Sequence, residues 1–243
     1  MTLILFPILG LILGSFFSVL ITRLQTGEAG IIKGRSHCPS CKKTLGPLQL
    51  IPILSFLAQK GRCAFCKKAI SPWYPALELS TATLFFAVAY LNPGAGLFEM
   101  TLMLALGSVW VLIFFYDLKY KAIHDLIVLP GIILAILGSF AWGDPLSSLY
   151  GALGGLVFFG GQWLLSRGRW IGSGDIGIGL LMGIQLGWPL LYTGILSGYL
   201  LGSCISITLL LTGKATRESQ IPLGPFLALG TMLAYLLPLQ GLL

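Results

Sequence analysis

The chain has 243 residues, of which 56% are hydrophobic and only 9% are charged, and its mean hydropathy is +0.91. This composition excludes a soluble globular protein and predicts a polytopic membrane protein in contact with the lipid bilayer. The net charge is +7. Because the cations fall on alternate loops between apolar stretches, we interpret this charge as an orientation signal and predict no nucleic-acid partner.

Apolar stretches long enough to cross about 30 Å of hydrocarbon recur along the chain. A backbone in lipid must satisfy its own hydrogen bonds, so these stretches predict helices and an all-α fold. We expect about eight transmembrane helices, near residues 3–22, 74–92, 98–116, 126–142, 149–165, 176–188, 190–211 and 222–242. The first stretch lacks the basic region and cleavage site of a secretory signal, so we expect it to be a membrane helix.

The basic residues predict the orientation of these helices. All fifteen lie in a long insertion and in three short loops, as Arg23, Lys33, Arg35, Lys42, Lys43, Lys60, Arg62, Lys67, Lys68, Lys119, Lys121, Arg167, Arg169, Lys214 and Arg217. The intervening loops near 92–97, 143–148 and 188–190 have none. Since Lys and Arg in short loops stay in the cytoplasm, we predict cytoplasmic basic loops and both termini outside.

The insertion between the first two helices predicts a small cytoplasmic domain. We therefore divide the chain into a first transmembrane helix (1–22), a cytoplasmic domain (23–73) and a larger transmembrane domain (74–243). Turn sequences such as Gly-Pro and Ser-Pro, without a long apolar period, support this division.

Four cysteines of the insertion form two similar motifs, Cys38-Pro-Ser-Cys41 and Cys63-Ala-Phe-Cys66, separated by 21 residues. Two CxxC turns can supply four thiolates to one Zn²⁺, which leaves no open position for a substrate. Disulfides do not persist in a reducing cytosol, so we predict a structural zinc site in a zinc-ribbon-like insertion. His37 is an alternative ligand.

Two aspartates are candidate catalytic residues. Asp117 follows the apolar run that begins at Val109, and Asp175 closes Gly172-Ser-Gly-Asp just before the sixth predicted helix. Carboxyls at the edge of a membrane are costly in lipid and tend to face water or the bundle interior. Two carboxyls from different helices can hydrolyse a peptide bond, one activating water and the other protonating the substrate.

Helix dipoles suggest different roles for the two carboxyls. Asp175 near a helix N-terminus favours its charged form, whereas Asp117 lies near a helix C-terminus. We therefore expect Asp175 to be the base and Asp117 the acid. Two alternatives are helix capping by these aspartates and ion-coupled transport, in which Asp117, Asp125 and Asp175 would be ion ligands.

Four blocks of the chain resemble the type IV prepilin leader peptidase family of Gly-x-Gly-Asp aspartyl proteases. The blocks are Gly10–Leu24, the cysteine motifs with their flanks from Arg35 to Glu78, Tyr116-Asp117 with Asp125, and Gly172–Asp175. The interval from Asp117 to Asp175 is also close to that of the family, which favours Asp117 over Asp125. The chain departs from the family pattern at Ser18, His124 and Gly177, and both carboxyls remain in place.

The resemblance implies that residues 74–243 are a transmembrane aspartyl protease domain with Asp117 and Asp175 as its catalytic residues. It implies cleavage of the basic leader of type IV prepilins or pseudopilins at the cytoplasmic face of the bacterial inner membrane. Many relatives also methylate the new N-terminus with S-adenosylmethionine, and we would look for that activity in the insertion with Glu78. A Gly-x-Gly-Asp protease resembling presenilin or signal peptide peptidase is a further alternative, but those proteins lack the CxxC pair.

Overall fold

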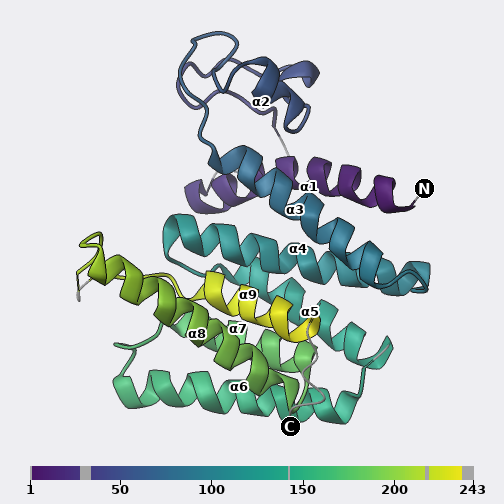
Figure 1. The fold of residues 1–243 in the computed structure, drawn as a ribbon, viewed down its shortest axis with the longest axis vertical. Coiled ribbons are helices and arrows are strands. Elements are labelled where there is room, and N and C mark those ends of the chain that lie inside the picture. Colours follow the sequence, from purple (N-terminus) through teal and green to yellow (C-terminus); the bar gives the residue numbers. More distant parts are fainter. Residues whose placement is uncertain (1, 28–33, 142, 217–218, 237–243) are drawn as a thin grey trace. The chain divides into compact units, whose positions relative to one another are not determined.

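The computed structural model describes residues 2–27, 34–141, 143–216 and 219–236. Its chain divides into two compact units, Met1–Met100 and Thr101–Leu243 (Figure 1). The domain limits expected at residues 22 and 73 remain a prediction. The predicted basic residues Lys33 and Arg217, and the ends of two predicted spans at 142 and 237–242, lie outside the described residues.

Helices form at all eight predicted positions. They are α1 (Thr2–Thr26), α3 (Trp73–Leu91), α4 (Leu97–Tyr120), α5 (Asp125–Ala141), α6 (Pro145–Ser166), α7 (Ser173–Leu186), α8 (Leu190–Leu211) and α9 (Gly224–Leu236). The insertion adds the 3-10 helix η1 (Pro47–Gln49) and the short helix α2 (Leu54–Ala58). No strand forms in the described ranges, so the prediction of an all-α fold is confirmed there.

Among the described residues, five helices are long and apolar enough to cross a membrane, namely α1, α3, α4, α6 and α8. The helices α5, α7 and α9 are apolar but have only 17, 14 and 13 described residues. The chain is therefore a multi-pass membrane protein, and the count of about eight spans remains a prediction.

The first unit is built on a close pair of helices. Helices α1 and α3 pack along each other, with Gly10 and Gly14 of α1 at the contact. A Cβ at Gly14 would lie 2.7 Å from the Cα of Glu78, so glycine lets the two backbones approach. The insertion leaves the end of α1 and returns to the start of α3 (Figure 1).

The second unit contains two close helix pairs, α6 with α7 and α8 with α9. Glycines face each other between α6 and α7, where a Cβ on Gly155 would overlap the backbone of Gly179. Gly230 of α9 fits in the same way against Gly194 of α8, and these two helices lie side by side in Figure 1. Small residues thus bring the helices of this unit close enough for dispersion contacts to hold them.

Candidate functional site

Asp117 lies in the last turn of α4, and its side chain is only 4% exposed. Its Oδ2 accepts a hydrogen bond of 2.8 Å from the backbone N–H of Gly224, the first residue of α9. A Cβ at position 224 would lie 2.7 Å from that oxygen, so any larger residue would displace the carboxyl. Sequence reasoning missed Gly224, although a Gly between Leu223 and Pro225 at a helix start was a usable signal.

Asp175 is the third residue of α7 and is 7% exposed. Its Oδ2 accepts a hydrogen bond of 2.9 Å from the N–H of Gly172, the residue that caps the helix. The backbone of Gly172 is extended (φ −75°, ψ 156°), which turns its N–H back toward the third position of the helix. The Gly-x-Gly-Asp motif is therefore the capped N-terminus of a helix.

Gly174 connects this turn to the segment that follows Asp117. A Cβ at position 174 would lie 2.7 Å from the Cβ of Ile123, which belongs to the loop between α4 and α5. Only glycine allows the α7 turn to pack this closely against that loop. The side chains of Asp117 and Asp175 lie close enough to interact electrostatically. The fold thus brings together two buried carboxyls that are distant in the sequence.

Asp125, the competing acid, has a different environment. It is the first residue of α5, and its side chain is exposed. The preceding His124 accepts a hydrogen bond of 3.2 Å from the N–H of Leu126 and packs edge-on against Tyr116, with ring centroids 5.7 Å apart. An exposed carboxyl at a helix start is suited to capping, whereas a buried pair is suited to sharing a proton.

The geometry weakens the dipole argument for different roles of the two carboxyls. Asp175 receives an N–H at the start of α7, as expected, but Asp117 also receives one at the start of α9. Both carboxyls therefore lie at the positive end of a helix dipole. The assignment of Asp175 as base and Asp117 as acid stays a prediction.

The two cysteine motifs have the same backbone structure. In the first, the N–H of Cys38 donates to Lys43 and the N–H of Lys42 donates to Cys38, at 3.0 and 2.8 Å. In the second, Cys63 donates to Lys68 and Lys67 donates to Cys63, at 2.9 and 3.0 Å. An isolated antiparallel bridge closes each turn, His37 with Thr44 and Arg62 with Ala69. His37, the alternative ligand, thus takes part in the first bridge through its backbone.

The sulfurs of Cys38, Cys41, Cys63 and Cys66 all lie within 4.8 Å of one another, and those of Cys38 and Cys66 are 3.9 Å apart. Tetrahedral Zn–S bonds of about 2.3 Å place sulfurs about 3.8 Å apart, so the four donors fit a metal ion. The backbone N–H of Cys41 lowers the pKa of the Cys38 thiol to about 6. The N–H groups of Cys66 and Phe65 lower the pKa of Cys63, so each turn favours one thiolate ligand.

Glu78 and the fifth cysteine, Cys204, lie outside these two sites. Cys204 is exposed on α8 and takes no part in the sulfur cluster. Glu78 of α3 is 8% exposed, accepts a hydrogen bond of 2.8 Å from the N–H of Ile53, and is also bonded by the Ser15 side chain. These two hydrogen bonds connect the carboxylate of Glu78 to the insertion and to α1.

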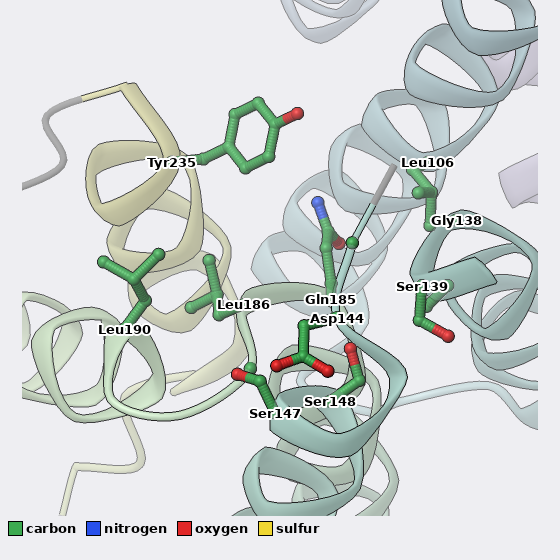
Figure 2. A pocket seen from close by; sticks show the side chains of 13 residues that line it. Leu106, Gly138, Ser139, Asp144, Ser147, Ser148, Gln185, Leu186, Leu190 and Tyr235 are labelled. Atoms are coloured by element: carbon green, nitrogen blue, oxygen red, sulfur yellow. The ribbon is translucent and has the colours of Figure 1, made fainter. Parts of the chain in front are cut away.

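Figure 2 shows a cavity of about 130 Å³ that is lined by Gln185 and Leu186. These two residues end α7, whereas Asp175 lies in its first turn. The cavity lies between the start of α6, which contributes Ser147 and Ser148, and the end of α7, which contributes Gln185. Its polar groups largely serve the fold, since Asp144 caps Leu146 at 2.9 Å and Gln185 accepts from Trp110 at 2.6 Å. This cavity is separate from the carboxyl pair.

Comparison with known proteins gave matches over both units. Residues 8–92 match the model of the bacterial peptidase A24 N-terminal domain, and residues 104–207 match that of the type IV leader peptidase family. A relative from Bacillus subtilis named prepilin leader peptidase/N-methyltransferase is 37% identical over 94% of this chain and 92% of its own length. Proteins of the same name from Aeromonas salmonicida and Pseudomonas aeruginosa are 36% and 31% identical, over 83% and 94% of this chain and 71% and 88% of their own lengths. No solved structure matches the chain.

Proposed function

Because the chain belongs to the type IV leader peptidase family, we propose that it is a membrane aspartic endopeptidase that removes the basic leader from type IV prepilins or pseudopilins. The observation that carries this proposal is the buried pair of Asp117 and Asp175, each held by one backbone N–H. The names of relatives over nearly the whole chain support the same activity. An ion-coupled transporter finds no support in these relatives.

The carboxyl pair suits peptide hydrolysis by general acid–base catalysis. One ionised carboxylate takes a proton from water, which then attacks the scissile carbonyl carbon. The other carboxyl, protonated, donates its proton to the carbonyl oxygen. When the C–N bond breaks, the first carboxyl passes the proton that it took from water to the leaving amine, and the second takes back a hydroxyl proton of the intermediate, so the pair again holds one proton. Burial of both groups disfavours two neighbouring negative charges, so the pair is suited to holding one proton between them. The hydrogen bonds from Gly172 and Gly224 keep both side chains in position.

We place the reaction at the cytoplasmic face of the bacterial inner membrane. Lys119 and Lys121 flank the end of α4, and Arg167 and Arg169 precede the start of α7, so basic loops adjoin both carboxyls. Alkaline phosphatase, which needs disulfides and so folds only outside the cytoplasm, reports this orientation when it is fused to the chain. Fusions after Asp144 are expected to be active and fusions after Lys121 inactive. The reverse pattern would overturn the placement.

The cysteine cluster is proposed to hold a structural zinc ion. Four thiolates would fill the coordination sphere of a zinc ion and leave no position for water, so the metal would stabilise the insertion and take no part in hydrolysis. Methylation of the new N-terminus with S-adenosylmethionine is proposed from the names of the relatives alone. Mass spectrometry of the processed pilin tests it, because a methylated N-terminus is one methyl group heavier.

Co-expression with a prepilin tests the peptidase proposal. Asp117→Asn and Asp175→Asn keep the size of the side chain and its acceptor oxygen, and each is expected to lower leader cleavage by about 10³-fold or more. Asp125→Asn is the matched control, because that carboxyl is exposed, and it should process the prepilin normally. Cleavage that survives both buried substitutions refutes the peptidase proposal. If cleavage is lost in Asp125→Asn and in only one of the other two variants, Asp125 is a member of the catalytic pair in place of the aspartate whose substitution has no effect.

A further inference from the structure

One segment of the insertion combines exposed leucines with a complete lack of charge. Between Lys43 and Lys60 there is no Asp, Glu, Lys or Arg. Within this segment Leu48 is 75% exposed, Leu54 66% and Leu57 64%. Large aliphatic side chains grouped in this way on a small domain indicate a surface that meets a nonpolar partner.

The fold fixes this segment to a membrane helix. Ile53, which precedes α2, has φ 60°, a conformation that β-branched residues rarely adopt. Its N–H donates to the buried carboxylate of Glu78 on α3 at 2.8 Å, and this bond supports the strained turn. The turn sets the direction of α2, from which Leu54 and Leu57 project into solvent. The apolar segment is therefore held in place by the same helix pair that crosses the bilayer.

The charges around the segment are all positive. No acidic residue occurs between Glu28 and Glu78. The described cations of this region are exposed, and they are Arg35, Lys42, Lys43, Lys60, Arg62, Lys67 and Lys68. An apolar centre with a cationic rim is the pattern of segments that lie in the interface of an anionic membrane.

We propose that residues 47–58 are a membrane-surface anchor. Leu48, Leu54 and Leu57 insert at the boundary between headgroups and acyl chains, and the surrounding lysines and arginines contact anionic phospholipids. Both ends of the insertion continue into membrane helices, α1 and α3, so it cannot leave the bilayer surface. A basic prepilin leader and the basic loops at Lys119 and Arg167 are other conceivable partners of this segment. The positive charges around the segment would repel them. The proposal rests on the membrane location alone and is independent of the peptidase activity.

Photocross-linking in the full-length protein tests the contact. In one variant a benzophenone amino acid replaces Leu57. In the control variant it replaces Ala69, which is exposed on the second cysteine turn. The chain is reconstituted in vesicles of phosphatidylethanolamine and phosphatidylglycerol and irradiated, and its intact mass is measured. We expect phospholipid adducts at position 57 in about tenfold excess over position 69. Equal lipid adducts at both positions, or adducts of position 57 to added prepilin or to the chain itself, would overturn the proposal.

Proteolysis gives a second readout that does not need the cross-linker. In phosphatidylglycerol vesicles the bond after Lys60 should be protected from trypsin. Replacing phosphatidylglycerol by phosphatidylcholine, or introducing Leu54→Asn with Leu57→Asn, should speed cleavage there by about tenfold. Zinc content is measured in parallel, because an unchanged metal shows that the insertion remains folded. If the rate of cleavage after Lys60 stays the same after both changes while the zinc content is retained, the proposal of a membrane-surface anchor is wrong.

Discussion

The cysteine cluster and the aspartate pair are assembled in opposite ways. In the insertion, two short turns with the same hydrogen bonds each present two sulfurs, so each motif by itself positions half of the ligand set. The aspartates come from different helices, and each is oriented by a glycine N–H, Gly172 from its own turn and Gly224 from a distant one. The comparison shows that a site made from local turns depends on its own residues, whereas a site made between helices depends on residues far from it in sequence.

The largest effect is expected where the local site loses a ligand. Cys63→Ser removes one of four thiolates, and structural zinc is worth about 10 kcal/mol or more to a small domain. The variant should lose its zinc, and the insertion should become sensitive to trypsin. Metal content per chain and the proteolysis pattern are the measurements. Cys204→Ser is the matched control, since that thiol is outside the cluster, and loss of metal in it would contradict the assignment of ligands.

The next effect concerns the distant residue of the aspartate site. Gly224→Ala places a Cβ 2.7 Å from the Asp117 Oδ2, so the carboxyl must shift. A displacement of about 1 Å costs roughly 10²-fold in rate, and prepilin cleavage should fall by about that factor while zinc content stays normal.

Gly161→Ala is the control for this substitution, because a Cβ there meets no atom within 4 Å. Comparable losses in both variants would show that Gly224 acts only through general stability. Normal cleavage by Gly224→Ala would show that the hydrogen bond to Asp117 does not matter for the reaction.

Helix packing around the site should respond more weakly. Gly155→Ala puts a methyl group against the backbone of Gly179 on α7, the helix that carries Asp175. Overpacking of this kind costs about 2 kcal/mol, so the thermal unfolding temperature in detergent should fall. Gly160 on the same helix has open space where a Cβ would lie, so Gly160→Ala should leave the unfolding temperature unchanged or raise it slightly. An equal decrease in the two variants would argue against close α6–α7 packing.

The smallest effect is expected from a polar contact between helices. Trp110→Phe removes the 2.6 Å hydrogen bond to Gln185 and keeps an aromatic ring in the buried position. Such bonds between membrane helices contribute about 0.6 kcal/mol, so the unfolding temperature should change only slightly. A loss of cleavage as large as that in Gly224→Ala would show that the far end of α7 also controls the aspartate pair.

The sequence predicted those features that depend on neighbouring residues. Helix positions followed from apolar stretches, and the ends of α8 were placed at the correct residues, 190 and 211. The ends of other helices differed, since α4 continues to Tyr120, beyond the expected 116. Hydropathy reports where lipid contact ends, whereas backbone hydrogen bonds can continue past the bilayer, so Asp117 lies within the helix rather than after it.

By itself, the sequence determined the membrane class of the protein, the metal-binding motifs and the two aspartates as candidates, because composition and short spacings carry that information. Only the tertiary structure decided that Gly224 holds Asp117, that Gly174 packs on Ile123, and that Glu78 supports the turn at Ile53. These contacts join residues far apart in the chain, and helices packed through small residues can slide or rotate in many registers. Which register forms is decided by the sum of many weak interhelical contacts, and no single motif encodes that sum.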